Sequence, residues 1–310
     1  MAPLCPITDR RHPGWASAIL TGAGRPPEAG SGDSATPGPA PSAGTIRTVR
    51  LLSSLVLVVA VLAGCGADQG GDADPGQVDA VEVPELGACR VLTPEDVARA
   101  SNATRTVDCT ERHTAQTYAV GDLPEELHDA SYDDEELGAF AYETCSQRFQ
   151  ELLGADESLV MRTIVSWAWF RPSEKAWEDG ARWYRCDVVG GGEQSEEYVA
   201  LPETAEGLLL GRPQDRWMVC ALGPSVAEGE KVPCSQPHDW RAVTTIKLGD
   251  KSDEYPGDRV AEVTTRDFCS DSVGAWLGYP VEYDFGYTWF HEAEWEAGNR
   301  RSVCWARTPD

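Results

Sequence analysis

Residues 177–186 read WEDGARWYRC, and residues 295–304 read WEAGNRRSVC. The two stretches align without a gap and share a tryptophan, a glutamate, a glycine, an arginine and a cysteine at the same spacing. The matched residues are Trp177, Glu178, Gly180, Arg182 and Cys186 in the first stretch and Trp295, Glu296, Gly298, Arg300 and Cys304 in the second. A pattern that recurs this closely within one chain indicates an internal duplication.

The match continues upstream of both stretches. VDCTERH at 107–113 corresponds to VPCSQPH at 232–238, so each copy carries a Cys-x3-His pattern. A Trp-Phe pair also recurs, at 169–170 and at 289–290. These matches keep the same order in both copies, as expected for a tandem repeat of one structural unit.

The duplication predicts the organisation of the chain. We expect two homologous units over residues 85–190 and 214–310, joined by a linker over 191–213. Helical spacing of apolar residues predicts one main helix in each unit, at 135–153 and at 258–277. Alternating and β-branched segments predict strands at 114–120, 159–170, 182–189, 240–248, 281–290 and 301–307. The predicted fold class is therefore α+β, with two tandem disulfide-stabilised units that each combine an antiparallel sheet with one main helix.

Composition excludes some classes of function. The chain has 310 residues, with 26 Lys and Arg against 51 Asp and Glu, for a formal net charge of −25. Because nucleic-acid phosphates are bound by clustered Lys and Arg, this charge argues against a nucleic-acid partner. It also argues against electrostatic adhesion to anionic lipid. The apolar fraction of 41% is sufficient for a folded core.

The N-terminal part has the features of a leader. Residues 1–48 are rich in Pro, Gly, Ala and Ser, which is typical of a disordered stretch or of a start codon assigned too early. Residues 49–64 combine a basic start with an apolar run that is too short to span a bilayer, as in a signal peptide.

A lipid anchor is expected where the leader ends. Leu62-Ala63-Gly64-Cys65 resembles the lipobox of bacterial lipoproteins, which implies cleavage before Cys65 and a diacylglyceryl thioether on its sulfur, with fatty acids such as palmitate as the acyl chains. Two acyl chains suffice for stable membrane anchoring without a basic patch. We expect the Gly- and Asp-rich residues 65–84 to form a flexible tether to the first unit.

Eight cysteines remain once Cys5 in the leader and Cys65 are set aside, four in each unit. An exported protein meets an oxidising environment, so disulfides are expected. Pairing within each unit leaves three arrangements per unit. We favour first with second and third with fourth, because these bridges would close a hairpin and tie the helix to the last strand. The favoured pairs are Cys89–Cys109, Cys145–Cys186, Cys220–Cys234 and Cys269–Cys304.

Metal binding is the rival use of these cysteines. Cysteine and histidine are zinc ligands, and the Cys-x3-His pattern occurs twice. The thiols would have to stay reduced outside the cytoplasm, and the C-x2-C spacing of common zinc sites is absent. We therefore predict no metal and no cofactor. Eight acids fall within residues 122–136, and their spacing differs from that of a calcium loop, so we expect a solvated insertion there.

Six side chains at repeated positions are candidates for a binding or a structural role. His113 and His238 are either ligand-binding residues or partners in a local hydrogen bond, and the local role is favoured. Trp177 and Trp295 either stack on sugars or pack in the core, and the core is favoured. Arg182 and Arg300 follow these tryptophans in the repeated W-E-x-G-x-R pattern, which predicts a turn between the last two strands of each unit. We call this pattern the corner motif.

No catalytic motif is present. G-x-S-x-G, H-E-x-x-H, a phosphate-binding P-loop and a dinucleotide-binding G-x-G-x-x-G are all absent, so no catalytic residue is predicted. The leading interpretation is a non-enzymatic binding or scaffolding protein, with its default site in the groove between the two units. A cell-wall-modifying hydrolase or a metal-dependent envelope enzyme is the alternative.

The segment VPCSQPHDW at 232–240, the cysteine within each main helix and the terminal W-x2-G-x-R-x3-C resemble the septum formation-related domain of high-GC Gram-positive bacteria. The resemblance covers most of residues 85–310, and it implies a link to cell division or the cell envelope. We therefore expect a lipid-anchored protein on the extracytoplasmic face of the cell membrane. Its expected partner is another envelope protein or a cell-wall polymer.

Overall fold

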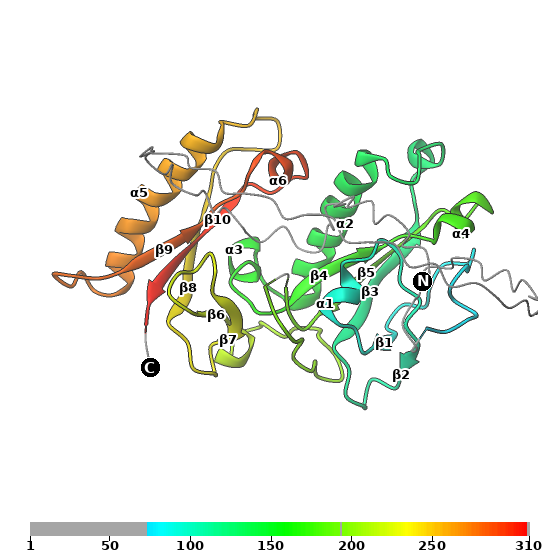
Figure 1. Cartoon of the computed structure of the whole chain (residues 1–310), viewed down its shortest axis with the longest axis horizontal. Helices are drawn as coiled ribbons and strands as arrows, with labels where there is room; N and C mark the ends of the chain where they lie inside the picture. The colour runs from blue at the N-terminus through cyan, green and yellow to red at the C-terminus, as the bar shows by residue number, and fades with distance from the viewer. Residues whose placement is uncertain (1–72, 193, 309–310) are drawn as a thin grey trace, which may run out of the picture. The chain divides into compact units, whose positions relative to one another are not determined.

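The computed structural model of the chain describes residues 73–192 and 194–308 (Figure 1). The predicted leader at 1–48, the signal peptide at 49–64 and the lipidated Cys65 lie outside the described residues.

The first unit forms a five-stranded antiparallel sheet with the strand order β2-β1-β3-β5-β4. Its strands are β1 (Cys89–Arg90), β2 (Thr106–Val107), β3 (Ala115–Asp122), β4 (Ser166–Phe170) and β5 (Trp183–Val189). Its helices are α1 (Pro94–Val97), η1 (Glu125–Leu127), α2 (Glu135–Leu153), α3 (Glu157–Val160) and α4 (Glu174–Glu178).

The second unit repeats this architecture, with the strand order β7-β6-β8-β10-β9. Its strands are β6 (Val219–Leu222), β7 (Glu230–Pro233), β8 (Trp240–Lys247), β9 (Phe285–Thr288) and β10 (Arg301–Arg307). Its helices are η2 (Asp215–Trp217), α5 (Asp258–Trp276) and α6 (Glu292–Glu296). Both units thus place the second, first, third, fifth and fourth strands side by side, which confirms the predicted α+β class with two related units (Figure 1).

The two sheets also share an irregularity. The pairing of β3 with β5 skips Tyr118 beside Cys186, and the pairing of β8 with β10 skips Val243 beside Cys304. Tyr118 and Val243 each lie five residues after the histidine of the Cys-x3-His pattern. Both copies thus have a β-bulge at the same position, which bends the strand next to the fourth cysteine.

The main helices form where the periodicity predicts them. An apolar or small residue recurs every fourth position, so one stripe of each helix can face the sheet. The buried stripes are Leu137, Ala141, Cys145, Phe149 and Leu153 in α2 and Ala261, Thr265, Cys269 and Val273 in α5. Asp134 caps the start of α2 by accepting from the backbone N–H of Glu136, and Gly154 ends it in a left-handed conformation.

The predicted strand at 159–170 is longer than the strand that forms. Its first part is the helical turn α3, because the Asp156 carboxylate accepts from the backbone N–H of Leu159 at 2.8 Å and caps that turn. Only β4 remains extended. The predicted strand at 281–290 likewise shortens to β9.

Four disulfides join Cys89 to Cys109, Cys145 to Cys186, Cys220 to Cys234 and Cys269 to Cys304. These are the four pairs that the sequence favours. In each unit the second bridge joins the main helix to the last strand. Cys145, Cys186, Cys269 and Cys304 are fully buried.

The segments flanking the first unit contact it. Ala73 pairs with Thr104, and the indole N–H of Trp183 donates to the Ala80 carbonyl at 3.1 Å, so residues 73–80 of the expected tether lie against the first sheet. Within the expected linker, Leu209 is fully buried and its N–H donates to the Leu153 carbonyl.

One hydrophobic cluster spans both units, while the buried residues between α5 and the second sheet form a separate cluster. A continuous buried cluster contains Cys186 and Val188 of β5 together with Val303 and Trp305 of β10. Backbone bonds also cross between the units, from Ile164 N–H to Trp217 O and from Val219 N–H to Arg162 O, each at 2.9 Å. The two repeats are therefore packed against each other and are not independent domains joined by a linker.

We expect the helix-to-strand disulfides to contribute more stability than the hairpin disulfides. The loop-entropy relation gives about 4 kcal/mol for a separation of 41 residues and about 3 kcal/mol for a separation of 14. Replacing both Cys145 and Cys186 with Ala also leaves a cavity in the core, which adds to the loss. Urea unfolding should therefore show a larger drop for Cys145→Ala/Cys186→Ala than for Cys220→Ala/Cys234→Ala. Equal losses would contradict this ranking.

Candidate functional site

In the corner motif of each repeat, the arginine packs on the ring of the tryptophan and donates to its carbonyl. We call this arginine–tryptophan pair the corner clamp. In the first unit the Arg182 guanidinium lies 4.1 Å from the Trp177 ring centroid and donates to the Trp177 carbonyl at 2.8 Å. In the second unit the Arg300 guanidinium lies 3.8 Å from the Trp295 ring and donates to the Trp295 carbonyl. Such contacts of a guanidinium with an aromatic face are attractive.

Both tryptophans are inside the protein. Trp177 is 7% exposed and Trp295 is 2% exposed, so neither ring offers a face to a sugar. Each lies on a one-turn helix, α4 or α6, which is followed by a glycine with positive φ, Gly180 at 98° and Gly298 at 114°. Glycine suits this left-handed position because it has no Cβ to clash. The motif thus closes the corner between the last two strands of each unit.

The repeated histidines are held by their own turns. His113 Nδ1 lies 2.9 Å from the Glu111 carbonyl, and His238 Nδ1 lies 2.7 Å from the Gln236 carbonyl. Because a carbonyl only accepts, Nδ1 must carry the proton in both residues. Both side chains are buried, and they precede strands of different sheets, β3 and β8.

The acidic stretch at 122–136 exposes most of its acids to solvent, as expected, while its apolar residues anchor it to the first unit. Leu123 and Leu127 are buried, and the Tyr132 hydroxyl donates to the Pro172 carbonyl at 3.1 Å. The Arg171 guanidinium lies 4.1 Å from the Tyr132 ring centroid and pairs with Asp133. Across the described ranges, no group of three or more His, Cys, Asp or Glu side chains is placed to hold a metal ion.

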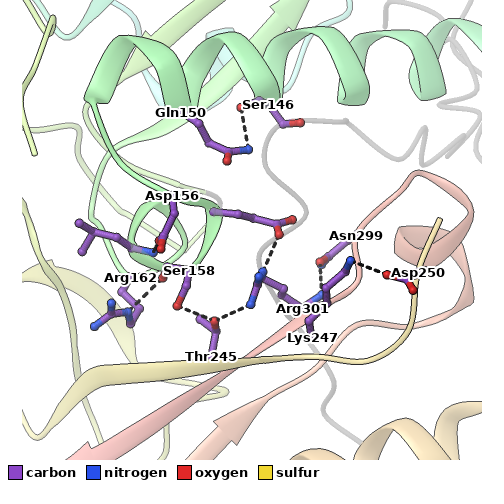
Figure 2. A network of polar contacts seen from close by, with 12 residues as sticks. Ser146, Gln150, Asp156, Ser158, Arg162, Thr245, Lys247, Asp250, Asn299 and Arg301 are labelled. Atoms are coloured by element: carbon purple, nitrogen blue, oxygen red, sulfur yellow. Dashed lines mark hydrogen bonds and ion pairs between the residues drawn. The ribbon is translucent and has the colours of Figure 1, made fainter.

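A polar network joins the two units (Figure 2). Arg301 on β10 pairs with Glu157 on α3 at 2.5 Å and donates to the Thr245 hydroxyl at 3.3 Å. The Thr245 hydroxyl in turn donates to Ser158 at 2.8 Å. The Arg162 guanidinium donates to the Val243 carbonyl at 3.0 Å. Polar side chains from both repeats therefore fix α3 against β8 and β10.

A pocket of about 50 Å³ adjoins this network. Phe149, Val160, Met161 and Trp167 form apolar walls, and Glu157 is shared with the polar network. A single water needs on the order of 10–15 Å³, whereas small-molecule sites usually measure roughly 300–1,000 Å³. This pocket therefore holds a few waters or one small side chain, and it is too small for a polymer substrate.

Three exposed apolar side chains lie close together in the sequence at the C-terminal end of α5. Trp276 is 50% exposed, Tyr279 is 76% exposed and Val281 is fully exposed. We call these three residues the α5-end patch. Among the tryptophans of the described residues, Trp276 alone is exposed. Tyr279 has a φ of 56°, a left-handed conformation that is unusual for a bulky residue.

This patch was not predicted from the sequence, because the candidate residues were those that occur at the same position in both repeats. Trp276 and Tyr279 stand where the first repeat has Leu152 and Ala155, counting from the cysteine of each main helix. The available signal was the apolar run WLGYPV at 276–281, directly after the helix.

Lys231 is a buried cation within the second sheet. Lys231 on β7 donates to the carbonyls of Val226 and Gly229 at 2.7 and 3.0 Å, and it lies 5.5 Å from the Trp305 ring centroid. Burial disfavours the charged amine and lowers the pKa of Lys231 from 10.5 to about 8.

The comparisons with known proteins give one result. The family model described as Septum formation matches residues 66–171 and again residues 165–304. Neither a curated protein nor a solved structure matches the chain. Within the described ranges, every helix is too short or too polar to cross a bilayer.

We expect Trp295→Ala to destabilise the protein strongly and Trp276→Ala to leave stability almost unchanged. The Trp295 ring packs on Phe290 and Arg300, and its N–H donates to the Asp253 carbonyl, so its removal should cost about 3–5 kcal/mol. Exposed positions usually change stability by about 0.5 kcal/mol or less. Denaturant unfolding of both variants measures the contrast, and a tolerated Trp295→Ala would place that ring outside the core.

We also expect the stability of the protein to depend on pH through Lys231. The folded chain releases this proton near pH 8, whereas the unfolded chain holds it to about pH 10.4. The unfolded chain therefore binds more protons between these values, and the contribution of Lys231 to stability rises with pH in that window. In Lys231→Met this contribution is absent. The difference in unfolding free energy between wild type and variant should shift in favour of wild type from pH 7.5 to 9.5, and a constant difference would contradict the assignment.

Proposed function

Because the chain belongs to the septum formation family, we propose that it is a lipid-anchored envelope protein that acts in septum formation by binding another component. Both repeats match the family, so the septum-related role applies to the whole folded part. The family is not one of known enzymes.

The binding role is supported by the difference in exposure between the repeated tryptophans and Trp276. The repeated side chains that could have formed a site, Trp177 and Trp295, are buried parts of the fold. The exposed tryptophan is Trp276, which stands beside Tyr279 and Val281. An exposed apolar patch on a protein this acidic is typical of an interaction site.

The anchoring part of the proposal rests on Cys65 and on the start of the folded part. Ala73, which pairs with Thr104, is eight residues after Cys65. Eight extended residues span at most about 28 Å. A lipid on Cys65 would therefore hold the first repeat within about 30 Å of the bilayer surface, on the extracytoplasmic side.

Metabolic labelling with an alkyne fatty acid tests the anchor. The wild-type chain should carry the label and stay in the membrane fraction after a high-salt wash. The Cys65→Ala chain should lose the label and leave the membrane. Label or salt-resistant membrane association in Cys65→Ala would contradict the anchor.

Complementation tests the binding role. In cells that lack the gene, a chain with Trp276→Ser and Tyr279→Ser should accumulate in the membrane but fail to restore normal septa. Val260→Ser, which alters an exposed residue near the other end of α5, should restore them. Full complementation by the double variant would contradict the role of the patch. Release of soluble fragments from peptidoglycan by the purified protein would instead favour a hydrolase.

A further inference from the structure

The two main helices end in the same way. Counting from Cys145 and Cys269, Leu152-Leu153-Gly154 corresponds to Trp276-Leu277-Gly278. Both glycines are left-handed, with φ of 69° for Gly154 and 82° for Gly278. The first repeat therefore shows what can bind to this kind of helix end.

In the first repeat a turn of the chain at residues 206–209 covers the helix end. The N–H of Gly207 donates to the Leu152 carbonyl at 2.7 Å, and the N–H of Leu209 donates to the Leu153 carbonyl at 3.0 Å. These are carbonyls of the last turn, which have no partner within a helix. The Leu209 side chain is 1% exposed and belongs to the main core. Two alternate N–H groups and one buried leucine thus form the contact.

In the second repeat the same groups lack a cover. Among the described residues, no N–H donates to the carbonyls of Trp276 and Leu277. Trp276, Tyr279 and Val281 are exposed at the same end of the helix. The unpaired carbonyls and the α5-end patch therefore occur together, at the position where the first repeat holds residues 207–209.

We propose that the end of α5 binds a leucine-bearing turn of a partner protein in the way that the end of α2 binds residues 207–209. The segment donates two alternate backbone N–H groups to the carbonyls of Trp276 and Leu277. Its apolar side chain lies against Trp276 and Tyr279. This inference rests on the proposed binding role and specifies the chemistry of the partner.

The probe is a fluorescent peptide with the sequence of residues 203–211, ETAEGLLLG. In fluorescence anisotropy it should bind saturably to the full chain carrying Cys65→Ala. Trp276→Ser should weaken binding at least tenfold, and Val260→Ser on the same helix should leave it unchanged. Because Trp276→Ser does not alter the first repeat, this pair of variants separates binding at α5 from exchange with the chain's own segment.

Two altered peptides test the chemistry of the contact. Methylation of the backbone nitrogen of Leu209 in the peptide removes one donor and should weaken binding at least tenfold. An aspartate in place of Leu209 should abolish binding. Absence of saturable binding to the wild-type patch, or equal binding by Trp276→Ser, would overturn the inference. If such a chain still carries lipid and restores septa, the proposed function stands and only the nature of the partner segment is wrong.

Discussion

Each repeat depends on one cross-link, the disulfide between its main helix and its last strand. Cys145 and Cys269 lie in the middle of the buried helical stripes, and their partners Cys186 and Cys304 lie beside a β-bulge. The disulfide fixes the position of the helix along the sheet. The buried stripe of the helix therefore packs on the strands in a single register. The corner clamps of Trp177 with Arg182 and Trp295 with Arg300 then close the chain between the last two strands of each sheet.

The residues on either side of the fourth cysteine differ in polarity between the repeats, because different segments cover them. On either side of Cys186 stand Arg185 and Asp187, a fully buried ion pair at 3.1 Å under the segment that contains Asn102. On either side of Cys304 stand Val303 and Trp305, which join the shared core. The first two cysteines are 20 residues apart in the first repeat and 14 in the second. The longer interval in the first repeat contains α1 and its flanking loop, which cover this face of the first sheet. The shorter interval in the second repeat contains no such segment, so the first repeat packs against the corresponding face of the second sheet.

Much of this fold could be predicted from the sequence, because local patterns and cysteine spacing determine it. The apolar period of four predicts α2 and α5, and the recurring Cys, His and Trp residues predict the duplication. Contacts between distant segments could not be predicted. Residues 159–160 have the composition of a strand, yet they complete a helical turn that Asp156 caps and that packs on β8. The α5-end patch escaped prediction for a related reason: exposure of Trp276 depends on which segment covers the helix end, and sequence pattern alone does not show that.

The shared core has an evolutionary consequence. A duplicated domain that remains independent can be lost, shuffled or copied again without harm to its neighbour. Here Val303 and Trp305 face the first repeat, and Leu209 between the repeats completes the core under α2. Neither half retains a complete interior when the other is removed. The two copies have become obligate partners within one polypeptide, so selection can act on each only through its effect on the pair.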